Sequence, residues 1–304
     1  FPGVPYETVQ KLLRTPGLMT VRVNEQAQFT NVEALSEYIE SGDAYFEDDM
    51  FRVGPLKIIS DGSLGARTAC LSRPYADDEN ARGIPLYTNA ELNGLISLAN
   101  EKGLSVAVHA IGDGAVEMCL NAIEYARREM PHLHPRHGIV HCQITDKEQV
   151  ERFKMLDVIA YIQPVFINYD MHIVYDRVGK ELGSTSYAWA DYIRLGVHAP
   201  FGTDCPVEAF RPLPGIYCAV TSRDLNGNGP FLPQQILDRE TALYCYSAQG
   251  AYCTGEEGVK GKIKEGMYAD FIVLDKDLVN CTDMEILEAK VLRTFVGGKC
   301  VYER

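Results

Sequence analysis

Four short apolar runs, each leading into a glycine-rich or polar turn, decide the fold of this chain. The runs are Gly54-Pro55-Leu56-Lys57-Ile58-Ile59, Ser105-Val106-Ala107-Val108-His109, Gly138-Ile139-Val140-His141 and Ala199-Pro200-Phe201-Gly202-Thr203-Asp204. We interpret Lys57, His109, His141 and Asp204 as the residues that close these runs. A (β/α)8 barrel gathers reactive side chains at the carboxyl ends of its parallel strands. The runs therefore predict barrel strands that share one site.

The spacing of these residues fits a repeated strand-helix unit. His109 and His141 are 32 residues apart, which is about one βα unit, and His141 and Asp204 are 63 apart, about two units. A strand predicted over 158–162 supplies the unit between them. Lys57 and His109 are 52 apart, which fits one unit plus an irregular insertion. Strands alternating with helices predict a parallel sheet.

The strand count predicts an incomplete barrel. Strands are expected near residues 20, 56, 107, 139, 160 and 199, two fewer than a barrel of eight. Helices are expected over 31–39 (with Asn31 as N-cap), 89–102, 115–128, 147–155, 189–195 and 239–251. The chain starts Phe1-Pro2-Gly3, without a start methionine or a signal-peptide pattern, so we expect an earlier segment to carry the missing strands. The predicted fold is α/β, a partial TIM-type barrel over residues 1–257.

The character of the sequence changes at Gly258. A strand is expected at Phe271–Leu274, and Val291–Tyr302 holds a hairpin-like Gly297-Gly298 turn. Residues 258–304 are therefore predicted to form a small C-terminal β-sandwich portion.

The composition excludes several classes of partner. A net charge of -13 argues against nucleic acid and against an anionic membrane surface. No apolar stretch approaches the length of a membrane span. The nine cysteines include no CxxC pair, a pattern typical of reduced thiols, so we expect a cytoplasmic protein.

The residues that close the runs suit a metal centre for hydrolysis. A catalytic divalent metal, most readily zinc, binds imidazole and carboxylate groups and keeps one position open for water. His109 and His141 suit metal ligation, and Asp204 suits both ligation and the general base that moves the water's proton. Lys57 has two interpretations. It is an ordinary salt-bridge lysine, or a buried neutral amine that forms a carbamate with carbon dioxide and bridges two metals.

Other polar residues have weaker claims. His132-Leu133-His134 has the spacing of a metal-binding pair, but Pro131 and Pro135 flank it, so we predict a loop there. Arg67, Gln163 and Arg177 are candidate substrate contacts, and each could equally be structural.

Several motifs, in this order along the chain, resemble the amidohydrolase superfamily. They are Lys57-Ile58-Ile59-Ser60-Asp61-Gly62-Ser63-Leu64-Gly65, Val108-His109-Ala110-Ile111-Gly112-Asp113, Arg136-His137-Gly138-Ile139-Val140-His141-Cys142-Gln143, Gly202-Thr203-Asp204-Cys205-Pro206 and Glu265-Gly266-Met267-Tyr268-Ala269-Asp270-Phe271. More narrowly, they resemble amidohydrolase family 3, the group that includes N-substituted formamide deformylase. The resemblance implies that Lys57 is a bridging ligand, that His109 and His141 bind metal, and that Asp204 is the proton shuttle. The family's first-strand H-x-H pair is absent from this chain.

We therefore expect a metal-dependent hydrolase with one or two ions, acting on a non-peptide C–N bond of a small amide or formamide. Two alternatives stay open: a catalytically silent module with a structural or interaction role, and a related deaminase or cyclic amidase. Because an open barrel exposes unpaired edge strands, we also expect a homo-oligomer, or another segment that completes the sheet.

Overall fold

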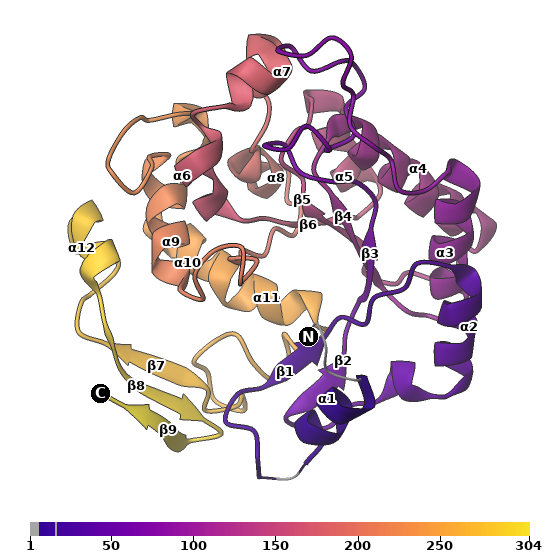
Figure 1. The fold of residues 1–304 in the computed structure, drawn as a ribbon. Helices are drawn as coiled ribbons and strands as arrows, with labels where there is room; N and C mark the ends of the chain where they lie inside the picture. The colour runs from indigo at the N-terminus through magenta and orange to yellow at the C-terminus, as the bar shows by residue number, and fades with distance from the viewer. Residues whose placement is uncertain (1–5, 16) are drawn as a thin grey trace.

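Parallel strands form the centre of the structure, a computed structural model that describes residues 6–15 and 17–304. Four regular strands pair in the order β3 (Leu56–Ile59), β4 (Val106–Ala110), β5 (Gly138–His141) and β6 (Ile159–Tyr161). Single parallel bridges, Gln28 to Lys57 and Ile162 to Phe201, add one segment at each edge. Figure 1 shows the four strands at the centre of the molecule. The prediction of an α/β fold built on a partial barrel is confirmed.

Helices cover the outer face of this sheet. They are α2 (Val32–Glu40), α3 (Asn89–Glu101), α4 (Asp113–Glu129), α5 (Lys147–Met155) and α8 (Trp189–Arg194), each within two residues of its predicted bounds. Consecutive members contact each other, and Figure 1 shows α2, α3 and α4 side by side beyond β3 and β4. The predicted cap of α2 is confirmed, because Asn31 accepts a 2.8 Å hydrogen bond from the Ala34 N–H.

Several further elements surround the barrel. They are α1 (Tyr6–Leu13), η1 (Asp43–Tyr45), η2 (Pro164–Phe166), α6 (Ile167–Asp170), α7 (Val174–Gly183), α9 (Pro212–Thr221), η3 (Pro233–Gln235), α10 (Arg239–Tyr246), α11 (Ala248–Cys253) and α12 (Asp283–Glu288). The single helix predicted over 239–251 is wrong: Ser247, with φ -125° and ψ -83°, separates α10 from α11. In the described residues, no helix is both long enough and apolar enough to cross a membrane.

The strand expected near residue 20 lies outside the barrel. The branched and apolar run Leu18–Val23 predicted it, but only Val23 of that run lies in a strand, β1 (Val23–Glu25), which pairs in parallel with β2 (Phe51–Val53) as a separate two-stranded sheet. Strand propensity does not specify which sheet a strand joins. The strand expected near residue 199 is reduced to the single bridge at Phe201, since Pro200 has no N–H to donate.

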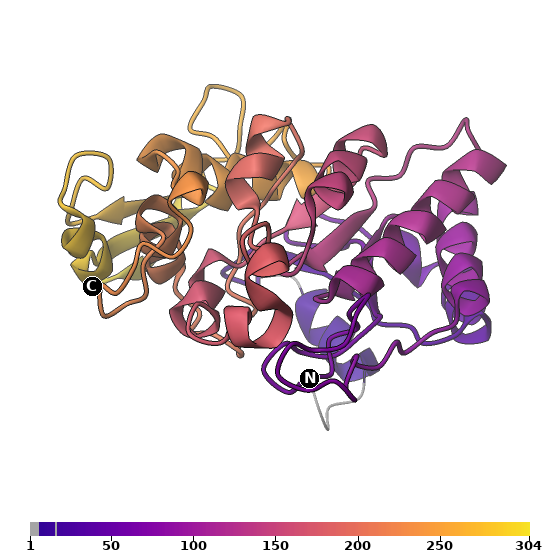
Figure 2. The same cartoon turned by 90° about the horizontal axis from the view of Figure 1, so that it is seen from above.

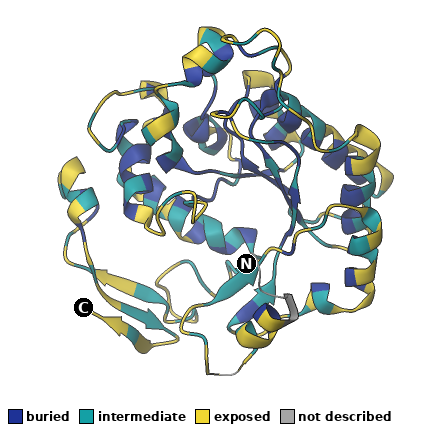
Figure 3. Cartoon of the chain, viewed as in Figure 1, coloured by how far each residue is buried: buried dark blue, intermediate teal, exposed yellow. Residues whose placement is uncertain are grey.

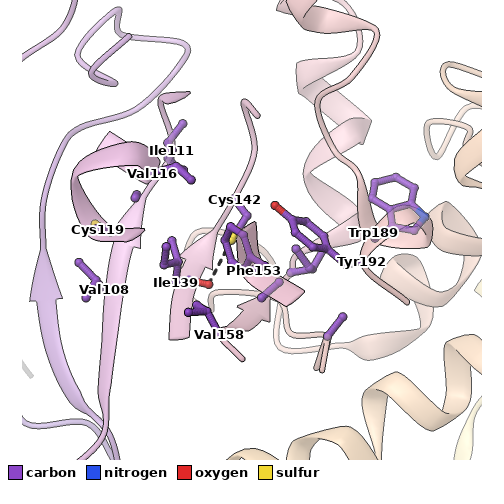
Figure 4. Packing of buried hydrophobic residues seen from close by; sticks show 14 of the residues in the cluster. Val108, Ile111, Val116, Cys119, Ile139, Cys142, Phe153, Val158, Trp189 and Tyr192 are labelled. Atoms are coloured by element: carbon purple, nitrogen blue, oxygen red, sulfur yellow. Dashed lines mark hydrogen bonds between the residues drawn. The ribbon is translucent and has the colours of Figure 1, made fainter. Parts of the chain in front are cut away.

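The core lies between the sheet and the outer helices. Alternate residues of β4 face opposite sides, so Val108 points to the helices while His109 points to the barrel interior. Figure 4 shows Val108 beside Val116 and Cys119 of α4. Figure 3 shows the central strands buried, and β4 and β5 have almost entirely buried side chains. The buried strands therefore hold the turns at their carboxyl ends in fixed positions.

The C-terminal residues form an antiparallel sheet of β7 (Phe271–Leu274), β8 (Val291–Val296) and β9 (Lys299–Glu303). The predicted hairpin turn is present, with positive φ at Gly297 (57°) and Gly298 (77°). Figure 2 shows this sheet and helices α3 and α4 at opposite ends of the molecule. The sheet lies wholly within 258–304, while the domain boundary at 257/258 stays a prediction. Residues 1–5, where we looked for a signal pattern, lie outside the described part of the chain.

Candidate functional site

A cavity of about 340 Å³ opens at the carboxyl ends of the parallel strands. Its walls include His109, His141 and Asp204, three of the four predicted site residues. Residues 63–65 after β3 and parts of 166–170 after β6 complete much of the lining. The volume is in the range of small-molecule sites, which run from about 300 to 1,000 Å³.

His109 is held by the turn that follows β3. Its Nε2 lies 3.1 Å from the Gly62 carbonyl oxygen and 3.2 Å from Asp61 Oδ1. A carbonyl only accepts hydrogen bonds, so the His109 proton belongs on Nε2 and Nδ1 keeps its lone pair. Asp61 is itself fixed, because it accepts backbone hydrogen bonds from Ile111 and Gly112 at 3.0 and 2.9 Å.

His141 reaches the same cavity through an irregular backbone. It pairs in register with Ala110, so regular alternation would point it away from the face that carries His109. Its φ of 82° breaks that alternation. The two imidazole rings meet edge to face, with centroids 4.5 Å apart. The left-handed conformation at the end of β5 therefore brings the two histidines together.

Gln163 fixes the proton on His141. His141 Nδ1 lies 2.8 Å from Gln163 Oε1, and the Gln163 amide nitrogen donates to the Tyr161 carbonyl at 3.2 Å. The second bond sets the amide orientation, so Nδ1 donates and Nε2 of His141 keeps its lone pair. Burial holds the pKa of His141 well below its ordinary value, and the charges of His109 and Lys57 add to that shift.

Lys57 does not close its strand, contrary to the prediction. It is the second residue of β3 and pairs with Ala107, on the same face as His109 but deeper in the barrel. The apolar Ile58-Ile59 that follows it extends the strand beyond the lysine. Burial lowers the pKa of Lys57, and the Asp204 carboxylate opposes that shift. The lysine is therefore within electrostatic reach of the site.

Asp204 lies in the turn after the Phe201 bridge, with a left-handed φ of 56°. Burial raises its pKa, while Lys57 and His109 oppose the shift. A carboxyl group with a raised pKa exchanges its proton nearer to neutral pH, which suits a proton shuttle.

The donor set fits two ligands of a metal centre. Histidines that bind metals typically donate their other N–H to a carbonyl or carboxylate, as His109 and His141 do. Across residues 6–15 and 17–304, no group of three or more His, Cys, Asp or Glu side chains is arranged to hold a metal ion. The free imidazole nitrogens of His109 and His141 could supply two ligands, and Lys57 and Asp204 are the nearby candidates for others.

The three predicted substrate contacts have protein partners. Arg67 and Arg177 both pair with Asp77, Arg67 through a bond of 2.8 Å, and neither residue lines the cavity. Gln163 is occupied by His141 and Tyr161. Their roles as substrate contacts stay predictions. The segment from 131 to 137 is a loop, as predicted for His132 and His134.

Sequence reasoning gave no individual role to several residues of the cavity wall, among them Gln143, Phe166 and Asp170. Gln143 and Asp170 line the cavity and hydrogen-bond each other at 2.6 Å, and Phe166 stacks on His141 at 5.7 Å. Gln143 follows His141 by two residues, which could have suggested it. Phe166 and Asp170 belong to short helical turns after β6 that carry no motif.

Comparison with known proteins identifies the family. The sequence profile described as the amidohydrolase family, in its group 3, matches residues 6–302. The chain belongs to the amidohydrolase family. This amidohydrolase is 38% identical over 256 residues to YtcJ of Bacillus subtilis (strain 168), which is assigned as an amidohydrolase; the match covers 83% of this chain and 47% of YtcJ. It is 25% identical to the N-substituted formamide deformylase of Arthrobacter pascens, over 85% of this chain and 47% of that protein.

Solved structures agree with the family. An uncharacterized metal-dependent hydrolase from Pyrococcus furiosus matches with a TM-score of 0.78 and 33% identity, over 90% of this chain and 54% of that one. A second, from Pyrococcus horikoshii, matches with a TM-score of 0.81 and 29% identity, over 91% of this chain and 55% of that one. This amidohydrolase chain spans about half the length of the curated relatives it matches.

Proposed function

We propose that this chain carries a site for metal-dependent hydrolysis of a C–N bond in a small amide or formamide. The observation that supports this most is the pair of neighbouring imidazoles, each with one nitrogen fixed as a donor and the other free. Membership of the amidohydrolase family and the metal-dependent hydrolases among the similar structures support the same chemistry.

Each residue has a proposed role. His109 Nδ1 and His141 Nε2 would hold a divalent metal, zinc by preference because imidazole and carboxylate ligands suit it. A metal bound there supplies a water of lowered pKa and polarises the scissile carbonyl. Asp204 would take the proton from that water and return it to the leaving nitrogen. The buried strands beneath the site keep these groups in place.

Lys57 is the proposed additional ligand. Its lowered pKa favours the neutral amine, whose lone pair can add to carbon dioxide with loss of a proton to form a carbamate. The carbamate would bring a negative charge close to His109 and His141. Mass spectrometry of the intact protein, purified with and without bicarbonate, tests for this adduct.

The experiment that tests the function combines metal analysis with an assay. The purified protein is expected to contain stoichiometric metal and to hydrolyse members of a panel of N-substituted amides and formamides. Replacing both His109 and His141 by Asn should remove the metal and the activity together. His172→Asn is the matched control, because His172 is half-exposed and pairs with Asp224 away from the cavity. Full hydrolysis by the metal-free double variant would refute the proposal.

A second candidate is a catalytically silent module. The observation in its favour is that the described residues place no three-residue His, Cys, Asp or Glu cluster around a metal position. Stoichiometric metal in the purified protein would count against a catalytically silent module. A deaminase or cyclic amidase would share the site, and the substrate panel separates these activities from amide hydrolysis.

We also propose a cytoplasmic location and self-association. All nine cysteines are free thiols in the structure, which supports a reducing compartment. The single bridges at Gln28 and Phe201 leave two short sheet edges, which support pairing with a second copy. Cell fractionation tests the location, and light scattering coupled to size-exclusion chromatography tests the oligomeric state.

A further inference from the structure

Gln143, Asp170 and Tyr187 form a hydrogen-bonded cluster at the cavity wall. The Gln143 amide nitrogen donates to Asp170 Oδ2 at 2.6 Å and to the Tyr187 hydroxyl oxygen at 3.2 Å. The Tyr187 hydroxyl donates to the same Asp170 oxygen at 2.9 Å. Gln143 and Asp170 line the cavity, whereas Tyr187 lies behind them and is buried.

These bonds use every side-chain donor of the cluster and leave acceptors free. Because the amide nitrogen of Gln143 points at a carboxylate, its Oε1 must point elsewhere. The side chain of Gln143 is only 5% exposed, and this oxygen is buried. It accepts no hydrogen bond from the described part of the chain. A buried polar atom without a partner costs about 1–3 kcal/mol, so a hydrogen bond donated to this oxygen by a group bound in the cavity would be stabilising.

The charge of the cavity selects the same kind of ligand. Asp170, Asp204 and Glu208 line it, and its lining includes no lysine or arginine. Phe166 and Tyr169 add aromatic surface close to these acceptors. A ligand that carries an N–H donor on a flat apolar group would satisfy the free oxygens, whereas an anionic group beside Gln143 would be repelled by the neighbouring carboxylates of Asp170 and Glu208.

We propose that Gln143 and Asp170 form a recognition subsite that binds a neutral or cationic N–H group of the substrate, with Tyr187 holding the Gln143 amide in the accepting orientation. This proposal rests on the proposed hydrolase function, because it treats the bound N–H group as part of the substrate of that reaction. The substrate class it adds is an apolar or aromatic amide with a second N–H group, rather than an amide that carries a carboxylate.

The test compares two probes that differ only at the N–H and contain no amide bond. Indole has an N–H donor, and 1-methylindole has the same ring system without it. Calorimetric titration of the purified protein should give a dissociation constant about fivefold lower for indole than for 1-methylindole, the size expected for one neutral hydrogen bond. Equal affinities would overturn the proposal.

Variants separate hydrogen bonding from the steric effect of the added methyl. In Gln143→Met, which keeps the side-chain volume but lacks the accepting amide, the indole preference should fall to near unity. In Asp170→Leu the preference should also fall, because Gln143 and Tyr187 lose the carboxylate oxygen to which both donate. Glu181→Gln removes an exposed carboxylate that does not line the cavity and should leave the preference unchanged. A preference that persists in Gln143→Met would overturn the proposal.

Amide hydrolysis measured on the same preparations keeps the two proposals apart. Indole discrimination without hydrolysis would support the subsite while the hydrolase function fails. Hydrolysis without indole discrimination would overturn the subsite and leave the hydrolase function standing. Because the wild-type comparison needs no variant, a misfolded Gln143→Met, detected by circular dichroism, would leave the first test intact.

Discussion

The two ends of strand β5 each carry a buried histidine, and the two are used differently. At the amino end, His137 Nδ1 accepts a hydrogen bond from the Val106 N–H at 3.2 Å, and Nε2 lies 3.1 Å from Asn100 Oδ1. At the carboxyl end, His141 is fixed at one nitrogen only, by Gln163. A histidine with both nitrogens satisfied is a structural residue, and one with a free nitrogen in a cavity is available for chemistry.

The backbone shows the same contrast. His141 and Cys142, at the carboxyl end of β5, have positive φ values of 82° and 48°, which non-glycine residues rarely adopt. Asp204, which lines the same cavity, has a φ of 56°. His137 is not among the residues with positive φ. Strained conformations persist where the surrounding structure holds them, and they cluster at functional sites. The carboxyl end is therefore built at a cost in stability that the amino end does not carry.

The largest effect is expected at Asp204. Replacing it with Asn removes the group proposed to move the proton, so the turnover number should fall about 10²- to 10⁴-fold. Asn tolerates a left-handed φ, so the melting temperature should stay close to that of the wild type. Steady-state kinetics and thermal melting measure the two quantities. An Asp204→Asn variant that hydrolyses amides at the wild-type rate would refute the proposed proton transfer by Asp204.

The second prediction compares matched substitutions on β5. His137→Asn should lower the free energy of unfolding by about 2–4 kcal/mol, since the shorter side chain cannot satisfy both Val106 N–H and Asn100. His141→Asn should change it by about 1 kcal/mol or less, because Asn suits the positive φ there. Urea denaturation measures both. Activity per folded molecule should survive in the first variant and be lost in the second.

Much of the fold could be predicted from local sequence signals. The predicted bounds of α2 to α5 lie within two residues of the observed ones, because helix signals such as the Asn31 cap of α2 act within a few residues. The sheet to which β1 belongs could not be predicted, since strand propensity does not specify a partner. The break at Ser247 was also missed, because residues 239–251 are rich in good helix formers and small residues and no Pro interrupts them.

The candidate site could be predicted only where residues close strands. His109 and His141 lie together as expected. Their close approach depends on the left-handed φ of His141, which no sequence pattern predicted. Gln163 was proposed as a substrate contact, but its position beside His141 follows from tertiary structure. Asp170 gave no signal, since its short helix resembles any loop segment.

The third prediction concerns pH. The stabilising contributions of the Asp170 and His137 side chains should change with pH in opposite directions. Burial raises the pKa of Asp170 from 3.8 to about 6, so the folded state holds that proton more tightly than the unfolded chain. Its stabilising contribution is complete below pH 3.8 and is lost as the pH rises to 6, in total about 3 kcal/mol. Burial lowers the pKa of His137 from 6.5 to about 3, so its contribution is complete above pH 6.5 and is lost as the pH falls.

Urea denaturation between pH 4 and 7 tests these opposite slopes. The stability of the wild type relative to Asp170→Asn should fall as the pH rises, whereas its stability relative to His137→Asn should rise. Parallel curves for the wild type and Asp170→Asn would show that the Asp170 carboxyl titrates alike in the folded and unfolded states.

The smallest effect is expected at the residues that orient the two histidines. Gln163 and Asn100 make the same two kinds of hydrogen bond. The amide oxygen of Gln163 contacts the His141 imidazole, and that of Asn100 contacts the His137 imidazole. The amide nitrogens donate to backbone carbonyls, Gln163 to Tyr161 at 3.2 Å and Asn100 to Ala126 at 3.3 Å. Gln163→Leu should weaken metal binding about 10- to 100-fold, because His141 loses the acceptor that fixes its tautomer. Asn100→Leu should leave metal affinity unchanged and lower the free energy of unfolding. Competition with a chelator measures the affinity. Equal affinities in the two variants would mean that the Gln163 bond orients no metal ligand.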